Sequence, residues 1–365
     1  MSAEEFIPQM RPLFGAEEKA ELADYLEEDG FFTEFKRTET FERQIADFTG
    51  ARHCIVVNNG TVSLTLAAIA LGVGPGDEVI VPDYTMIATP NSVKMLGAQP
   101  VFVDVEPDTL VMDIEKARAA ITPRTKALML VSANGRAPKA GVQAFKALCD
   151  AHGIALIEDA AQSLGSYYAP GLHVGRVGAI GSFSFSAPKI ISTGQGGALI
   201  TDDDALADKL RRLKDFGRRS GGTDVHDSIG YNFKFTELQA CVGIAQMKKL
   251  PARVERKKQI WRRYAEQLAG LSQLQLFAHD LSLCTPWFID CLAENRDALA
   301  AHLKSAGIGT RTMYPPINQQ LAYALPGSYP VAERIGRDGL WLPSMIQLSD
   351  AQIDRICAAV RSFYL

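Results

Sequence analysis

The feature that most constrains the fold is a series of short, almost uninterrupted apolar runs that recur between helical segments. Four of them are clear, at residues 78–82, 101–105, 127–131 and 154–159. Strands buried on both faces have this pattern, because helices cover both sides of a parallel sheet. The chain is therefore predicted to be an α/β protein with a mostly parallel sheet flanked by helices. Its functional groups are expected at the carboxyl ends of the strands.

Chain length and one proline determine the predicted domain boundary. With 365 residues, the chain can bury one large core and a smaller second one. Leu250 and Pro251 are predicted to interrupt a long helical segment that runs from about Glu237 to Gln267. We therefore place an N-terminal arm and a large domain in residues 1–250. A small C-terminal α+β domain is expected in residues 251–365.

The composition argues against several classes of partner. A net charge of −4, without any run of basic residues, predicts no nucleic-acid binding. The six histidines and six cysteines are scattered without the spacing of metal ligands, so we expect no metal site and reduced thiols. No stretch is apolar for long enough to span a bilayer, and the first residues lack the pattern of a signal peptide. We expect a cytoplasmic protein without a membrane partner.

The residues that can carry chemistry lie between 154 and 197. The first strand of this stretch ends in Asp159, and the second, residues 181–186, is followed closely by Lys189 and then by a glycine-rich turn. A lysine among apolar neighbours loses its proton more easily, and its free amine can form a Schiff base with the aldehyde of pyridoxal phosphate (PLP). Asp159, facing the ring nitrogen, would keep that nitrogen protonated. The competing interpretation is a solvated surface lysine and a helix-capping acid.

Three segments of this region together resemble the signature of the DegT/DnrJ/EryC1/StrS family of PLP-dependent nucleotide-sugar aminotransferases. They are residues 158–162 (EDAAQ), 182–189 (SFSFSAPK) and 194–197 (GQGG). The resemblance extends over nearly the whole chain and implies the fold type I aminotransferase architecture. It also implies a homodimer with shared active sites, with Lys189 and Asp159 as the catalytic residues.

The resemblance assigns further cofactor-binding residues. The turn at Asn59, Gly60 and Thr61 precedes a helix, and free amides at a helix start suit a phosphate, although an ordinary helix cap has the same pattern. The family resemblance places the cofactor phosphate at this turn. The implied cofactor contacts are Gly60 and Thr61 for the phosphate, Ser184 as a further phosphate ligand, Gln162 at the phenolic oxygen, and Asn232, which would reach the neighbouring subunit.

Several positions depart from the family pattern. Met86 stands where relatives stack an aromatic ring on the cofactor; it can take that place or be a plain core methionine. Gln195 replaces an acid beside Lys189. Residues 132–136 (SANGR) replace a His-Leu-Tyr-Gly-like sequence, so Asn134 and Arg136 are expected to face an oxygen-rich or anionic substrate, or else to lie on a surface loop. The remaining substrate candidates, each weighed against a surface role, are His226, Arg311 and Tyr314.

The resemblance implies transfer of an amino group from glutamate, which leaves as 2-oxoglutarate, to a keto sugar. Residues 189–197 look like the subgroup that acts on GDP-4-keto-6-deoxymannose, in surface polysaccharide (lipopolysaccharide O-antigen) biosynthesis. Because of Asn134 and Arg136, an aldehyde-bearing eight-carbon sugar acid is an alternative acceptor, as in 8-amino-3,8-dideoxy-octulosonate formation. A PLP-binding regulatory protein without turnover is the alternative from another class. A PLP-dependent sugar dehydratase is disfavoured, because it generally has histidine where this chain has Lys189.

Overall fold

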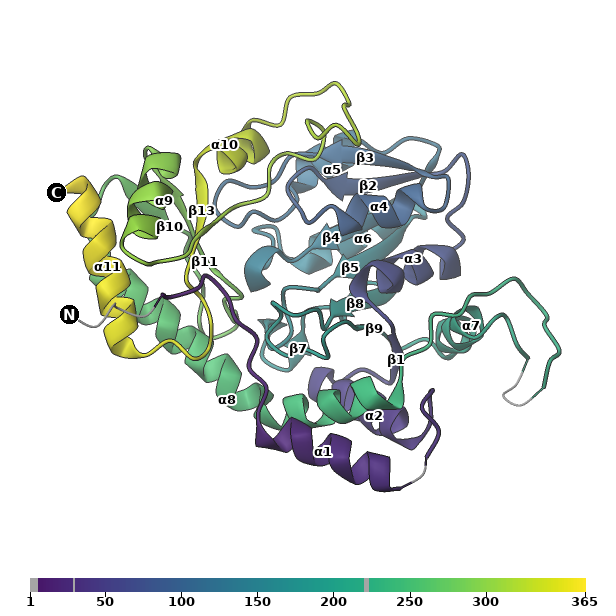
Figure 1. The fold of residues 1–365 in the computed structure, drawn as a ribbon. Helices are drawn as coiled ribbons and strands as arrows, with labels where there is room; N and C mark the ends of the chain where they lie inside the picture. The colour runs from purple at the N-terminus through teal and green to yellow at the C-terminus, as the bar shows by residue number, and fades with distance from the viewer. Residues whose placement is uncertain (1–5, 29, 220–222) are drawn as a thin grey trace.

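Two lobes of unequal size make up the protein. The computed structural model describes residues 6–28, 30–219 and 223–365. The larger lobe holds a seven-stranded sheet and the smaller, C-terminal lobe holds a four-stranded sheet, and the long helix α8 (Glu237–Gln267) runs along both lobes (Figure 1).

The seven-stranded sheet is mostly parallel, in the order β1-β9-β8-β5-β4-β2-β3. The strands β8, β5, β4, β2 and β3 run parallel to one another, whereas β9 is antiparallel to both β8 and β1. The predicted α/β class is therefore confirmed. Its strands are β1 (His53–Val57), β2 (Glu78–Pro82), β3 (Gln99–Val103), β4 (Thr125–Val131), β5 (Ala155–Asp159), β8 (Ile180–Ser184) and β9 (Gly197–Thr201).

Helices cover both faces of this sheet. Successive residues of a strand point to opposite faces, so an apolar strand contributes side chains to the core on either side. In β4, Ala127 and Met129 pack in the core under α3, α4 and α7, whereas Leu128 and Leu130 pack in the core with α6. α2 and α8 cover the same second face near β1 and β9. Besides the seven strands and α8, the elements before the smaller lobe are α1 (Ala16–Glu27), α2 (Lys36–Thr49), α3 (Gly60–Ala70), α4 (Ala88–Lys94), α5 (Ile114–Ala119), η1 (Ala133–Gly135), α6 (Val142–His152), β6 (Tyr167–Ala169), β7 (Leu172–His173) and α7 (Asp204–Lys214).

The smaller lobe is an antiparallel sheet in the order β10-β11-β13-β12, with helices packed against it. Its core includes the second half of α8, where the hydroxyl of the buried Tyr264 donates a hydrogen bond to the carbonyl of Pro343. The elements of this lobe are β10 (Leu274–Leu276), β11 (Ile289–Ala293), α9 (Arg296–Ser305), β12 (Arg311–Thr312), α10 (Pro330–Asp338), β13 (Gly339–Leu342) and α11 (Asp350–Tyr364).

The prediction that Pro251 interrupts the long helix is wrong. α8 is continuous over 31 residues with Pro251 inside it, so the predicted boundary at residue 250 falls within one helix. A proline removes one main-chain hydrogen bond, and packing on both sides compensates for that loss. The first half of α8 packs on α2 and the second half on α11. Among the described residues, no helix combines the length and apolar character needed to cross a membrane.

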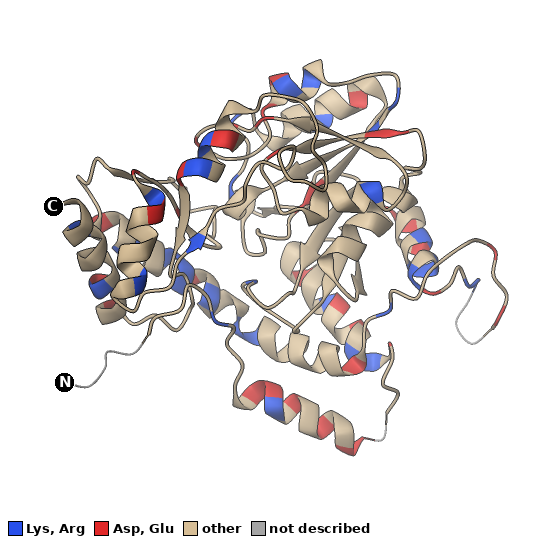
Figure 2. Cartoon of the chain, turned by 45° about the horizontal axis from the view of Figure 1, so that its top comes forward, with Lys and Arg blue, Asp and Glu red and all other residues tan. Residues whose placement is uncertain are grey.

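The N-terminal arm is attached to both lobes. Ile7 exchanges main-chain hydrogen bonds with Gly307 and Gly309 of the smaller lobe, at 2.9 and 2.8 Å. α1, which carries many acids, then lies beside a basic part of α8 (Figure 2). Lys248 pairs with Glu21 at 2.5 Å, and Lys249 pairs with two further acids of α1. The arm therefore fastens the lobes along one side of the molecule.

Candidate active site

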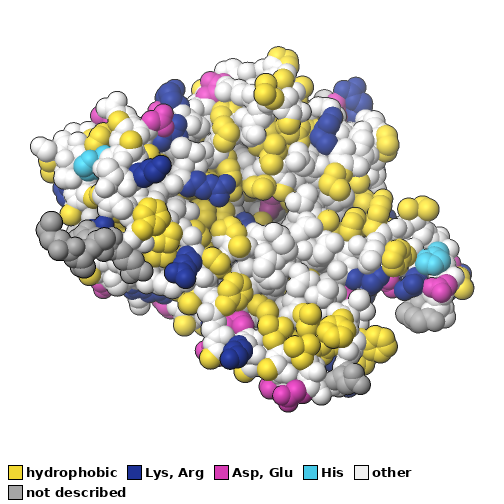
Figure 3. All heavy atoms as spheres, in the orientation of Figure 1, with side chains coloured by type: hydrophobic (Ala, Val, Ile, Leu, Met, Phe, Trp, Pro, Cys, Tyr) yellow, Lys and Arg dark blue, Asp and Glu magenta, His cyan; other side chains and the backbone are white. Residues whose placement is uncertain are grey.

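A cavity of about 430 Å³ lies at the carboxyl ends of the parallel strands, where the two lobes meet. The molecular surface is hollowed between the lobes in Figure 3. The larger lobe contributes the segments that follow β1, β2, β5 and β8. The smaller lobe contributes Trp287, Arg311 and Tyr314. The site therefore depends on how the two lobes are held together.

Lys189 presents its amine to this cavity. Burial lowers the pKa of the amine to about 8; Asp159 opposes this shift and the Arg311 guanidinium reinforces it. The Nζ atom lies 4.2 Å from the centroid of the Trp287 ring. A lysine with this pKa has a substantial unprotonated fraction near neutral pH and can act as a nucleophile or a base.

Asp159 ends β5 and is buried beside the same cavity. Its Oδ2 accepts a hydrogen bond of 2.7 Å from the Thr89 hydroxyl, which lies 2.9 Å from the Thr85 hydroxyl. Its Oδ1 accepts a hydrogen bond from the Ala161 amide at 3.2 Å. Burial raises the pKa of this carboxyl, against the effects of Thr89, Ala161 and Lys189. A cationic ring nitrogen placed here would favour the carboxylate form.

The N-terminus of α3 forms the other end of the cavity. Asn59 caps the helix by accepting a hydrogen bond from the Val62 amide at 2.9 Å, and the first amides of the helix have no partner inside it. Gly60 approaches β8 closely: a Cβ atom there would lie 2.8 Å from the Cβ of Ser184. A Cβ on Gly197 would lie 2.4 Å from the carbonyl oxygen of Asn59. Two glycines thus bring amides and hydroxyls together in a cradle that fits a phosphate dianion.

The predicted cofactor and substrate residues fall into two groups. Residues that line the cavity include the predicted Gly60, Thr61, Met86, Asp159, Gln162, Ser184, Lys189, Arg311 and Tyr314, and also Gln195. Met86 is 45% exposed and therefore is not a core methionine, whereas Tyr84 is buried and packs against Tyr314. The donor set of the cavity fits PLP: an amine, a buried carboxylate opposite it, and a phosphate cradle.

Asn134 and Arg136 are not among the residues that line the cavity, which corrects the expectation that they face substrate. Arg136 forms a bidentate ion pair with Asp290 of β11, with N–O distances of 2.7 and 2.8 Å, and both side chains are buried. The Asn134 side chain is bonded to the main chain of Trp287 and Phe288. Both residues therefore join the two lobes.

His226 and Asn232 also lie outside the cavity of their own chain. Both are exposed in the segment between α7 and α8, where the Nδ1 atom of His226 lies 2.9 Å from the carbonyl oxygen of Phe216. From the sequence we also expect the loop at residues 217–226 to contribute to sugar selectivity, and its residues 220–222 are outside the described residues.

The sequence did not point to Thr89 or Trp287 as site residues. A threonine in the segment after a buried strand is the kind of signal that could have indicated Thr89. Trp287 carried no such signal, because it belongs to the smaller lobe and reaches Lys189 only through the packing of the lobes.

The architecture and the cavity together define a fold type I PLP-dependent aminotransferase. The family model described as the DegT/DnrJ/EryC1/StrS aminotransferase family matches residues 13–361, and the chain belongs to this family. It is 32% identical to GDP-perosamine synthase of Vibrio cholerae, over 98% of this chain and 99% of that protein. It is 37% identical to GDP-perosamine synthase of Caulobacter vibrioides, over 88% of both.

Solved structures with the same fold include relatives above 30% identity, among them DesV and TlmJ. The S. venezuelae protein DesV has a TM-score of 0.89 and 34% identity, covering 97% of this chain and 98% of DesV. The aminotransferase TlmJ of Streptoalloteichus hindustanus has a TM-score of 0.92 and 31% identity, covering 98% of both chains. The similarity therefore extends through both lobes.

Proposed function

We propose that the protein transfers an amino group from glutamate to a nucleotide-linked keto sugar, with GDP-4-keto-6-deoxymannose as the acceptor. The observation that carries this proposal is the Lys189 amine, which shares a cavity with Asp159 and the α3 cradle. The acceptor is supported by the relatives named GDP-perosamine synthase. The product would enter lipopolysaccharide O-antigen synthesis, and we place the enzyme in the cytoplasm.

Each of the polar residues of the cavity has a separate role in aminotransfer. Bound PLP supplies an electron sink for the carbon that loses its proton. Lys189 takes that proton on Nζ and returns it to a different carbon, which its pKa of about 8 allows. Asp159, oriented by Thr89, holds a proton on the cofactor's ring nitrogen. The exposed guanidinium of Arg311 is suited to bind a substrate carboxylate.

The alternative acceptor, an eight-carbon sugar acid, is not favoured. Its case depended on Asn134 and Arg136 facing an anionic substrate, whereas Arg136 is neutralised by Asp290. A regulatory protein without turnover is also not favoured, since the chain belongs to an aminotransferase family.

We also propose a homodimer in which Asn232 completes the neighbouring active site. Exposed apolar side chains in two segments support this: Phe31 and Phe32 are 68% and 58% exposed, and Ile229 is 82% exposed. The amide of Glu237 donates to the carbonyl of Phe32 at 3.0 Å, which joins the Phe31–Phe32 segment to the start of α8, shortly after Asn232. Large exposed apolar surfaces mark interfaces.

The test is a two-step assay of the PLP-loaded protein. Glutamate should convert the absorbance of the bound cofactor to that of the pyridoxamine form, and a keto sugar should restore it. GDP-4-keto-6-deoxymannose is compared with a keto sugar on another nucleotide and with an eight-carbon aldehyde acid. Lys189→Arg should abolish both steps, whereas the exposed Lys94→Arg should not. Restoration by the acid and not by the nucleotide sugars would contradict the proposed acceptor.

A further inference from the structure

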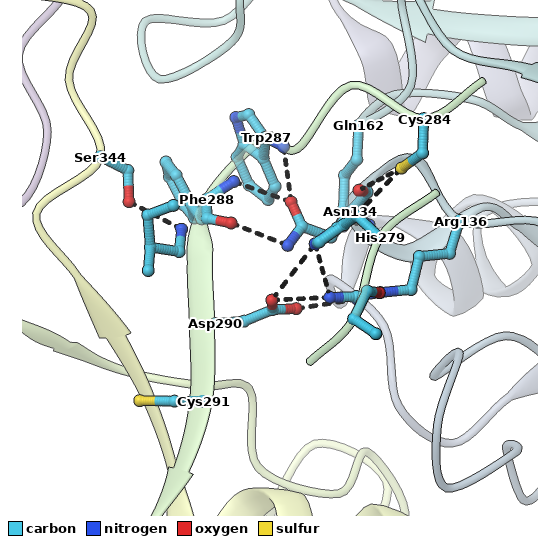
Figure 4. A network of polar contacts seen from close by, with 12 residues as sticks. Asn134, Arg136, Gln162, His279, Cys284, Trp287, Phe288, Asp290, Cys291 and Ser344 are labelled. Carbon is cyan, nitrogen blue, oxygen red and sulfur yellow. Dashed lines mark hydrogen bonds and ion pairs between the residues drawn. The ribbon is translucent and has the colours of Figure 1, made fainter. Parts of the chain in front are cut away.

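Asn134 is a buried residue that connects the large lobe to the small one. It lies in η1, directly after β4, and its backbone is left-handed, with φ of 53°. Asparagine tolerates this conformation better than most other non-glycine residues. Its Oδ1 accepts hydrogen bonds from the amides of Trp287 and Phe288 at 2.6 and 2.7 Å, and its Nδ2 donates to the Phe288 carbonyl at 2.8 Å (Figure 4).

The main chain of Asn134 contacts a residue that lines the cavity. Its amide donates a hydrogen bond of 2.7 Å to the Oε1 of Gln162, a residue that lines the cavity. A side-chain amide has one oxygen and one NH₂ group. Because the oxygen is occupied by Asn134, the NH₂ group of Gln162 is the part left to donate to a ligand.

Trp287 is held at three points. Asn134 accepts its amide hydrogen, Lys257 Nζ donates to its carbonyl at 2.6 Å, and its own indole N–H donates to the Pro188 carbonyl at 2.8 Å. These bonds fix the indole so that its face lies over the Lys189 amine. An aromatic face in this position stabilises a positive charge on that nitrogen.

We propose that Asn134 is a positioning residue that sets two walls of the active site at once. It turns the Gln162 amide toward the cofactor and holds Trp287 over Lys189. The inference rests on the proposed function only in that Lys189 and Gln162 are taken to meet the cofactor. Any substitution at Asn134 that frees the Trp287 main chain should then reduce the stabilisation of a positive charge on Lys189 Nζ by the indole ring.

The test compares variants by following the absorbance of the PLP-loaded protein as a function of pH. This absorbance changes when the Lys189 nitrogen that is joined to the cofactor loses its proton, and the midpoint of the change gives the pKa of the transition. Trp287→Leu removes the aromatic face and should lower this pKa by about half to one unit. Asn134→Gly tolerates the left-handed backbone and keeps the amide that binds Gln162, but it loses the bonds to Trp287. It should shift the pKa in the same direction, and the double variant should shift it no further than Trp287→Leu alone.

Turnover and stability separate positioning from a purely structural role. Asn134→Gly should lower kcat at least about tenfold, with a smaller change in KM for glutamate. Asp290→Asn breaks a neighbouring contact between the lobes, without touching Asn134 or Trp287, and should lower the melting temperature without moving the titration. If Asn134→Gly behaves like Asp290→Asn, or if its shift adds to that of Trp287→Leu, the proposal is overturned.

Asn134→Asp keeps both accepting bonds and provides a second variant should the glycine variant fail to fold. It should not lower the pKa of the transition, and a fall as large as that of Trp287→Leu would count against the role of Asn134. The titration needs no amino acceptor. Failure of aminotransfer to nucleotide sugars therefore contradicts the proposed function, whereas an unshifted titration contradicts this inference alone.

Discussion

Removal of Arg136 tests how the two lobes are joined. Arg136 and Asp290 are 4% and 1% exposed, and the ion pair is bidentate. Arg136→Met leaves the carboxylate of Asp290 buried, with His279 Nε2 at 3.6 Å from its Oδ1. Breaking a buried ion pair from one side costs about 3–5 kcal/mol of unfolding free energy. We expect a loss of that size at neutral pH.

The loss should also depend on pH. Burial alone would raise the pKa of Asp290, but Arg136 and His279 hold it below its ordinary value. A lowered folded-state pKa contributes stability above the unfolded pKa of about 4, and this stability disappears as the pH falls through the folded pKa. Without Arg136, the Asp290 carboxyl takes up a proton at a higher pH than in the native protein, because burial then acts with less opposition. The unfolded state is common to both proteins, so the difference between the native protein and Arg136→Met should shrink as the pH falls through the Asp290 pKa of the variant.

Urea unfolding of four proteins measures this effect. They are the native protein, Arg136→Met, Asp290→Leu and the double variant. The double variant should be more stable than either single variant, because no charge is left unpaired. Arg118→Met, at an exposed ion pair with Glu115, is the control and should change little. A loss below about 1 kcal/mol for Arg136→Met, or additive losses in the double variant, would refute the reasoning.

Three further predictions concern the cofactor site. The Cβ of Gly197→Ala would lie 2.4 Å from the Asn59 carbonyl oxygen, so this variant should bind PLP at least about tenfold more weakly in a titration of the cofactor-free protein. Unchanged affinity would contradict the role of Gly197 in the phosphate cradle. The rate at which PLP binds covalently should rise with pH with a midpoint near 8, because only unprotonated Lys189 attacks; a rate independent of pH between 6 and 9 would argue against a lowered pKa. Asp159→Asn should still bind PLP but convert glutamate at least about a hundredfold more slowly in single-turnover measurements, and a native rate would remove Asp159 from the mechanism.

Local patterns in the sequence were enough to predict the large sheet and the groups at its edge. Buried strands followed by polar residues place Asp159 and Lys189 in the same cavity, because the ends of parallel strands meet. The phosphate roles of Ser184 and of the turn at Gly60 came from the family resemblance, since the local pattern at Gly60 also fits an ordinary helix cap.

The contacts between the lobes could not be predicted from local patterns. Arg136 and Asp290 are 154 positions apart, and so are Asn134 and Phe288. A loop arginine looks the same in the sequence whether it meets a substrate or a buried acid. Pro251 was also misjudged, since the packing that supports α8 comes from α2 and α11.

The central claim is that Lys189 is the residue joined to the cofactor. The direct measurement is borohydride reduction of the PLP-loaded protein, followed by proteolysis and mass spectrometry. The structure predicts a single pyridoxyl group on the peptide that contains Lys189, and none after Lys189→Arg. A pyridoxyl group found on another lysine, or its retention in Lys189→Arg, would contradict the account.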